Sequence, residues 1–176
     1  NGDTSGSVQL VVPAVAGSSV VTVAAQTGTL YAAGPAFYAT MSSSQTINAS
    51  SFTKVQFNTK QFDTNSNYDA TTNYRFTPNL AGYYLVIGSI AWQGSYAYSQ
   101  TLIYKNGSVA KYSSPIYSGF TGTELYGNMS ALIYANGSTD YFEIYFYQNS
   151  GSNKNVYGGG TAPSYCYFSG SLVRAA

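Results

Sequence analysis

Histidine is absent from the 176 residues of this chain, and cysteine occurs once. Without histidine, the chain has no Ser–His–Asp triad, no histidine-ligated zinc and no imidazole acid–base group. A single cysteine cannot form an intramolecular disulfide, so stability must come from packing or from the association of several copies. Cys166 lies in the run Tyr-Cys-Tyr-Phe, and we expect it to be a small buried core residue rather than a nucleophile.

Charged side chains are almost as scarce, at 7% of residues where about 25% is usual. The net charge is +1 and the basic residues do not cluster, which excludes the basic face that nucleic-acid binding requires. The apolar runs are too short and too polar to cross a bilayer, so we expect no membrane insertion. So little charge is typical of a protein that is embedded in a larger assembly.

The acidic residues form only two close pairs, Asp63 with Asp69 and Asp140 with Glu143. Paired carboxylates can hydrolyse glycosides, and clustered carboxylates can bind calcium. Asp140 and Glu143, however, point to opposite faces of a predicted strand, while Asp63 and Asp69 lie among turn-forming residues. We therefore expect no catalytic residue, no cofactor and no metal ligand, and calcium is the alternative that the acids leave open.

Tyrosine and glycine take the place of charge. The chain has 19 Tyr, 9 Phe and 18 Gly, with many Ser, Thr and Asn. Tyr and Thr favour half-buried pleated surfaces, and Gly and Asn favour turns, so the composition predicts an all-β protein. No segment shows the period of a helix.

Residues 1–34 differ from the rest, since no charged residue occurs between Asp3 and Lys54. Two β-branched runs, 8–12 and 20–23, are joined by the segment 13–19. Each run is too short and too apolar on both faces to be stable alone in water. We therefore predict a connector or stalk at 1–34, covered by another chain, followed by one domain at 35–176.

Within 35–176, turn signals separate short strands, which predicts a sandwich or jelly roll of about ten strands. Asn106-Gly107 and Asn136-Gly137 predict two-residue β-hairpins, because both positions of such a turn must tolerate positive φ. The predicted strands are 35–40, 45–48, 52–57, 74–77, 82–93, 98–105, 125–134, 140–148 and 165–174.

The segment 140–148 alternates cleanly between two faces. Phe142, Ile144 and Phe146 share one face, which we predict to be core. The other face carries three tyrosines and Glu143, which is too aromatic for a plain solvated surface and indicates burial against another copy. The candidate interface residues are Tyr141, Tyr145, Tyr147 and Tyr167.

Seven positions in chain order resemble the globular head of the complement q-subcomponent, in the tumour-necrosis-factor-like jelly-roll superfamily. The segments 35–39, 102–107 and 167–172 match its first strand, a middle hairpin and its closing strand. Two departures are a gap between Tyr68 and Phe76 that is one residue longer, and Val86 and Gly88 where aromatics are usual. The resemblance implies a homotrimer closed around an aromatic and apolar axis, and some relatives bind calcium near that axis. The seven positions are Phe57, Asp63, Tyr68, Phe76, Gly82, Tyr84 and Val86.

The leader is similar to segments that recur in bacteriophage fibre and virion proteins, through residues 3–7, 12–17 and 26–30. This second resemblance implies a phage virion protein that is assembled in the bacterial cytoplasm and bound to other virion proteins through 1–34. The leader lacks collagen-like Gly-x-y repeats, which argues against an animal source.

Aromatic rings beside Asn and Ser suit carbohydrate stacking. The segment 149–160 reads as a long polar loop, and such loops often carry binding function. The alternative is that these rings pack in the core or between subunits. The candidate ligand-contact residues are Trp92, Tyr96, Tyr98, Tyr112, Tyr117, Asn153, Lys154 and Tyr157.

The leading functional prediction is a non-enzymatic phage virion protein, a trimeric fibre or appendage tip that attaches to a host-surface glycan or protein. One alternative is a capsid decoration or cement trimer that binds no receptor. A second alternative is a secreted bacterial binding head of the same fold.

Overall fold

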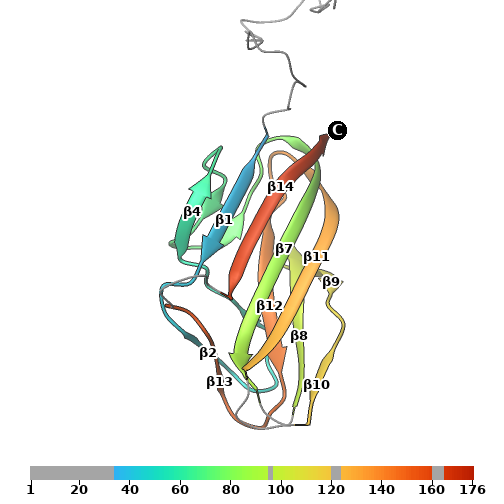
Figure 1. Cartoon of the computed structure of the whole chain (residues 1–176). Helices are drawn as coiled ribbons and strands as arrows, with labels where there is room; N and C mark the ends of the chain where they lie inside the picture. Colours follow the sequence, from blue (N-terminus) through green and yellow to red (C-terminus); the bar gives the residue numbers. More distant parts are fainter. Residues whose placement is uncertain (1–33, 95–96, 120–123, 160–164) are drawn as a thin grey trace, which may run out of the picture. The chain divides into compact units, whose positions relative to one another are not determined.

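The computed structural model describes residues 34–94, 97–119, 124–159 and 165–176, so the predicted connector lies outside the described residues except for Gly34. The described residues form fourteen strands in two seven-stranded sheets, with no helix (Figure 1). The all-β jelly-roll prediction is therefore confirmed. None of the described segments is a helix of the length and hydropathy needed to cross a membrane.

The first sheet is built around β7, which pairs with β11, β13 and β14. Its order is β2-β13-β7-β14-β1-β4, and β11 also pairs with β7. All these pairings are antiparallel. The strands of the first sheet are β1 (Ala36–Thr40), β2 (Gln45–Ile47), β4 (Thr59–Asp63), β7 (Ala81–Gln93), β11 (Glu124–Asn136), β13 (Lys154–Val156) and β14 (Tyr167–Ala175).

The second sheet is built around β8 and β12, in the order β10-β8-β12-β6-β5, with β3 paired to β12 and β9 to β8. The register places Ile144 opposite Ile103 and Phe146 opposite Thr101. Its strands are β3 (Thr53–Lys54), β5 (Tyr68–Asp69), β6 (Arg75–Phe76), β8 (Ala97–Lys105), β9 (Ser108–Tyr112), β10 (Ile116–Ser118) and β12 (Phe142–Gln148).

Each of the nine predicted ranges contains a strand. Five strands were not predicted: β4, β5, β9, β10 and β13. They are two to five residues long and rich in polar residues, so their sequences lack the alternation that marks a half-buried strand. Neighbouring strands, rather than local pattern, hold them in the sheets.

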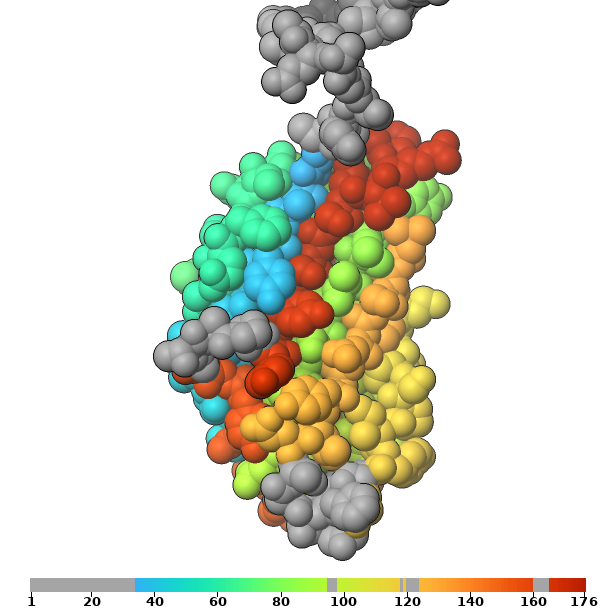
Figure 2. Space-filling view, viewed as in Figure 1, coloured from blue at the N-terminus to red at the C-terminus, as the bar shows by residue number. Residues whose placement is uncertain are grey.

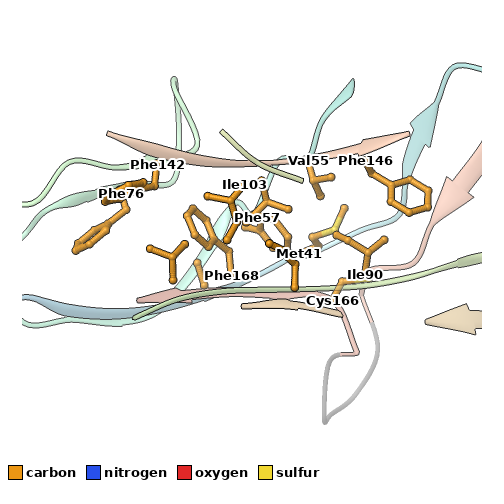
Figure 3. Packing of buried hydrophobic residues seen from close by; sticks show 14 of the residues in the cluster. Met41, Val55, Phe57, Phe76, Ile90, Ile103, Phe142, Phe146, Cys166 and Phe168 are labelled. Carbon is orange, nitrogen blue, oxygen red and sulfur yellow. The ribbon is translucent and has the colours of Figure 1, made fainter. Parts of the chain in front are cut away.

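The core between the sheets is dominated by aromatic rings (Figure 3). The Phe37 ring of β1 stacks on Tyr68 at 4.6 Å and on Phe76 at 4.4 Å, and meets Phe168 edge-on at 4.8 Å. Because β1 and β14 belong to one sheet and β5 and β6 to the other, this cluster joins the two layers. Gly170 makes room for it, since a Cβ at that position would lie 2.9 Å from the Phe37 ring.

The predicted core face of β12 is confirmed, since Phe142, Ile144 and Phe146 are fully buried. The aromatic positions of the family pattern are also core residues. Buried positions of that pattern are Phe57, Tyr68, Phe76, Tyr84 and Val86.

The two Asn-Gly turns differ. Asn106-Gly107 is a hairpin as predicted, with φ of 53° and 76° between the paired strands β8 and β9. The prediction of a hairpin at Asn136-Gly137 is wrong, because it links β11 of the first sheet to β12 of the second. Only Gly137 has a positive φ, of 73°, while the Asn136 side chain accepts hydrogen bonds from the backbone N–H groups of residues 138–140.

The Asp140 side chain bonds to residues of both Asn-Gly turns. Its carboxylate accepts hydrogen bonds from Asn106 Nδ2 at 2.7 Å and from the Asn136 backbone N–H at 3.0 Å, and it pairs with Lys105 at 2.8 Å. Burial alone would raise the pKa of Asp140, but donation from Lys105, Asn106 and Asn136 outweighs it and the pKa is lowered.

We expect Gly137→Ala to destabilise the fold more than Gly107→Ala. Both substitutions place a side chain at positive φ, which costs about 1–2 kcal/mol. At Gly137 the new Cβ would also lie 2.3 Å from the Ala81 backbone nitrogen, whereas at Gly107 its nearest neighbour would be 3.5 Å away. Urea unfolding of both variants measures the difference, and equal losses would contradict the account of this turn.

We also expect acidic pH to lower the unfolding free energy of the wild type by more than it lowers that of the Asp140→Asn variant. A carboxyl with a lowered folded-state pKa stabilises the fold above its unfolded pKa, and this contribution is lost as the pH falls below about 4. The Asn side chain does not titrate, so the Asp140→Asn variant does not lose stability by this route. The expected difference is about 1.5–3 kcal/mol of unfolding free energy, the usual contribution of hydrogen bonds to a charged group. Urea unfolding at pH 6 and pH 2.5 compares the two proteins, and parallel losses would exclude Asp140 as a contributor.

Candidate interaction surface

The outward face of the first sheet is the main exposed apolar surface in the described part of the chain. Along β7, Tyr84 and Val86 point into the core, so Tyr83, Leu85 and Ile87 point outward. β11 and β14 alternate in the same way. Figure 2 looks onto this outward face, across β4, β1, β14, β7 and β11.

No charged residue lies among the outward positions of β7, of β11 beyond Glu124, or of β14 before Arg174. Glu124 and Arg174 lie near the ends of their strands, and in β4 Lys60 pairs with Asp63, whose side chain is 2% exposed. The outward residues are Tyr83, Leu85, Ile87 and Ser89 of β7, Tyr126, Asn128, Ser130, Leu132 and Tyr134 of β11, and Tyr167, Ser169 and Ser171 of β14.

The register places apolar residues side by side across these strands. Leu85 lies opposite Leu132, and Tyr83 lies opposite Tyr134, with their rings 5.6 Å apart. Towards the β4 edge, Tyr38 stacks between Phe62 and Tyr167. These cross-strand pairs place aromatic and aliphatic side chains across the whole face, separated by serines and Asn128, and one chain does not cover them.

A shallow depression of about 220 Å³ interrupts this surface between β1 and β7. Serines of β14 form its floor, because small side chains there leave the larger neighbours standing above them. Its outward lining includes Tyr38, Phe62, Leu85, Ile87, Ser169 and Ser171. A protruding apolar side chain of another molecule would fit such a hollow.

Two tyrosines of the outward face, Tyr38 and Tyr126, have raised pKa values and remain uncharged at neutral pH. Burial, and then the nearby Tyr167, raises the pKa of Tyr38. Donation of its hydroxyl to Glu124 at 2.8 Å, followed by burial, raises the pKa of Tyr126 to about 12. These phenols therefore offer apolar rings and neutral hydroxyls to whatever covers the sheet.

The four predicted interface tyrosines do not form one surface. Tyr167 lies on the outward face of the first sheet, whereas Tyr141, Tyr145 and Tyr147 lie on the outer face of the second. There, Tyr145 stacks on Tyr104 at 3.8 Å and Tyr141 packs under the Arg75 guanidinium at 4.3 Å. Much of their ring area is thus covered within the chain.

Glu143, which was predicted to share that face, is buried and paired with Lys54 at 2.9 Å. Sequence reasoning missed the outward residues Tyr83, Leu85, Leu132 and Tyr134. The alternation of β7 and β11 carries the signal, but it becomes visible only once the inward face of each strand is known.

The candidate ligand-contact residues also lie in different parts of the structure. Trp92 is fully buried against Phe146, so it is a core residue and has no face to offer a ligand. Tyr96 lies outside the described residues. Tyr98, Tyr112 and Tyr117 lie together on the second sheet, in β8, β9 and β10.

The predicted loop 149–160 is interrupted by β13, which pairs with β2 and β7. Lys154 lies in that strand and is half-buried, while Tyr157 donates its backbone N–H to Ala91 O. Asn153 is exposed and accepts a hydrogen bond from the Ala49 N–H. These three residues lie on the first-sheet side, apart from the tyrosines of β8–β10.

The carboxylates of Asp63 and Asp69 both accept hydrogen bonds from backbone N–H groups. Asp63 accepts hydrogen bonds from the N–H groups of Asn67 and Tyr68, and Asp69 accepts them from those of residues 71–73. These bonds hold the pKa of Asp69 well below its usual range. No group of three His, Cys, Asp or Glu residues that could hold a metal ion occurs among the residues described.

Comparison with known proteins shows the fold and no closer relationship. No protein-family model and no curated protein matches the sequence. Among solved structures, the Eiger TNF of S. frugiperda matches with a TM-score of 0.56 and 10% identity, covering 81% of this chain and 93% of that chain. Murine APRIL matches with a TM-score of 0.58 and 7% identity, covering 80% of this chain and 100% of that chain. The tumour-necrosis-factor-like part of the resemblance is thus confirmed at the level of fold.

We expect the Cys166 thiol to be unreactive in the folded protein. The side chain is buried, and burial raises the pKa of Cys166 to about 11, so almost no thiolate is present at pH 8. A coloured disulfide reagent should titrate one thiol per chain in denaturant and none within minutes in buffer. Rapid modification of the native protein would contradict the assignment of Cys166 to the core.

Proposed function

We propose that this chain is a non-enzymatic phage virion protein whose jelly-roll heads associate as a homotrimer and attach the particle to a host surface. The observation that carries the proposal is the uncharged outward face of the first sheet. Exposed apolar patches of this kind mark interaction sites or lead to aggregation, so a stable protein must cover them.

The outward face is best suited to being covered by a second copy of the same chain. Aromatic residues are enriched and charged residues depleted in the centre of protein interfaces, and the outward face shows both features. Its exposed charges lie near the strand ends, at Glu124 of β11 and Arg174 of β14, while Lys60 and Asp63 of β4 pair with each other at 3.2 Å. Charged side chains would therefore lie at the edge of such a contact rather than in its centre.

The number three is supported by the resemblance in sequence. Heads of the complement-q and tumour-necrosis-factor-like type close around a threefold axis that is lined by aromatic and apolar side chains. The outward face supplies such a lining here. Three copies would give every outward face a neighbour and leave none open to further growth.

The virion role is supported by the leader, which is similar to segments of phage fibre and virion proteins. Attachment without catalysis is supported by the chemistry of the head. Its acids are engaged in capping and ion pairing, and its one described thiol is buried.

Sedimentation equilibrium of three proteins tests the assembly. The wild type should have about three times the chain mass of 18.7 kDa. Leu132→Glu places a charge among the apolar side chains of the outward face, opposite Leu85, and should yield folded monomers or aggregates. Tyr112→Glu is the matched control, because both side chains are 57% exposed in a single chain but Tyr112 lies on the second sheet.

A monomeric wild type, or an intact trimer for Leu132→Glu, would contradict this assembly. Adsorption of the trimer to bacterial cells then tests the attachment role. A well-formed trimer that adsorbs to no cells would favour the capsid decoration alternative, which uses the same interface and binds no receptor.

A further inference from the structure

Four aromatic rings form a continuous line on the outer face of the second sheet. Phe52 contacts Tyr147 of β12 with ring centroids 4.8 Å apart, Tyr147 contacts Tyr98 of β8 at 5.7 Å, and Tyr98 contacts Tyr117 of β10 at 5.4 Å. We call this line the aromatic strip. Its rings come from four segments far apart in sequence, so the fold gathers them.

The ends of the aromatic strip are open to solvent. Tyr117 is 76% exposed and Phe52 is 48% exposed, while Tyr98 and Tyr147 between them are half-buried. Tyr117 has the largest exposed fraction of any large hydrophobic residue in the described chain. Its neighbour Tyr98 supports one part of the ring and leaves most of the rest open to water.

Neutral polar groups border the strip. Asn149 Oδ1 accepts a hydrogen bond from the Tyr98 N–H at 2.8 Å, which fixes the amide beside the rings. The Tyr98 hydroxyl donates to Gln100 Oε1, and Gln100 Nε2 donates to Ser113 O at 2.8 Å. The Tyr98 oxygen keeps its lone pairs as acceptors, so the edge of the strip offers fixed, uncharged hydrogen-bonding groups.

The strip consists of phenyl and phenol rings and contains no lysine, arginine or carboxylate side chain. Neither of the two cation–π contacts in the described structure involves it, since they lie at Tyr141 and Tyr134. Burial, followed by the neighbouring tyrosines Tyr117, Tyr147 and Tyr112, raises the pKa of Tyr98, so its phenol stays protonated. An anionic ligand would need lysine or arginine in place of these rings, whereas a neutral ligand needs none.

The strip lies at the end of the head opposite to both ends of its chain. Leu172 N–H donates to Pro35 O, and Ala176 N–H donates to Ala81 O, so the first and last described strands of the head start and finish together. Figure 1 shows β10 and the start of β8 at the other end. A head attached through its chain ends would present the strip outward.

We propose that the aromatic strip is a binding site for a neutral glycan, whose sugar rings stack on Phe52, Tyr98 and Tyr117. A sugar ring has an apolar C–H face and a rim of hydroxyls, which matches aromatic rings bordered by amide and phenol groups. This inference rests on the proposed attachment function and names the chemistry of the receptor.

Direct binding measurements test the site with immobilised oligosaccharides prepared from bacterial surface polysaccharides, in a neutral and an acidic set. The intact wild-type protein should bind members of the neutral set. Tyr117→Ala and Phe52→Ala should each weaken that binding by about tenfold, and together by more, because each removes one stacking ring. Leu80→Ala is the control, since it also trims an exposed apolar side chain but lies next to β7 at the opposite end.

Each outcome decides between the two proposals. The glycan site is wrong, and attachment stands, if the wild type adsorbs to bacterial cells but binds no neutral oligosaccharide or prefers the acidic set. The same conclusion follows if the Tyr117→Ala and Phe52→Ala variants bind the neutral set with full affinity. If the wild type adsorbs to no cells and binds no oligosaccharide, the attachment function itself is overturned. Near-ultraviolet circular dichroism and the sedimented mass check that every variant keeps its fold and assembly.

Discussion

The two sheets of this head are joined by aromatic packing, and the rest of the structure depends on it. Few charged residues and a single cysteine leave little for ion pairs or disulfides to contribute, and the rings pack with aliphatic side chains such as Ile90 and Ile103. Phe37 stacks between Tyr68 and Phe76 and meets Phe168, so one ring of the first sheet contacts two of the second. That cluster fixes the sandwich, and the sandwich decides which side of β7, β11 and β14 faces outward.

The same composition produces the outward face. A sequence with so much tyrosine and so little charge cannot cover both sides of its sheets with charged groups. The outward side of β7, of β11 beyond Glu124 and of β14 before Arg174 carries none. On the second sheet, tyrosines stack on one another, and Glu143 is covered by a partly buried ion pair with Lys54. One sheet thus keeps a surface suited to a neighbouring copy, and the other keeps a short strip suited to a small ligand.

The sequence was sufficient for the fold class, because alternation in β12 and the spacing from Phe57 to Val86 report on the core directly. The sequence was not sufficient to predict which outward residues are covered by other side chains. Tyr145 and Leu132 both alternate with core residues, but whether an outward residue is covered depends on neighbours such as Tyr104 that are distant in sequence. Trp92 could not be told from a surface ring for the same reason. Asn136-Gly137 has the chemistry of a hairpin, and only the pairing of its two strands shows that it crosses between sheets.

The most direct test of the central claim, that the outward face is covered by another copy, is hydroxyl-radical footprinting of the native protein. Tyr83, Tyr134 and Tyr112 are 45%, 41% and 57% exposed in a single chain, so their rings should be oxidised at comparable rates in a monomer. If a second copy covers the outward face, Tyr83 and Tyr134 will be strongly protected while Tyr112 is oxidised rapidly, and denaturant will remove the difference. Equal oxidation of all three rings in the native protein would show that the face is open to water and would contradict the account.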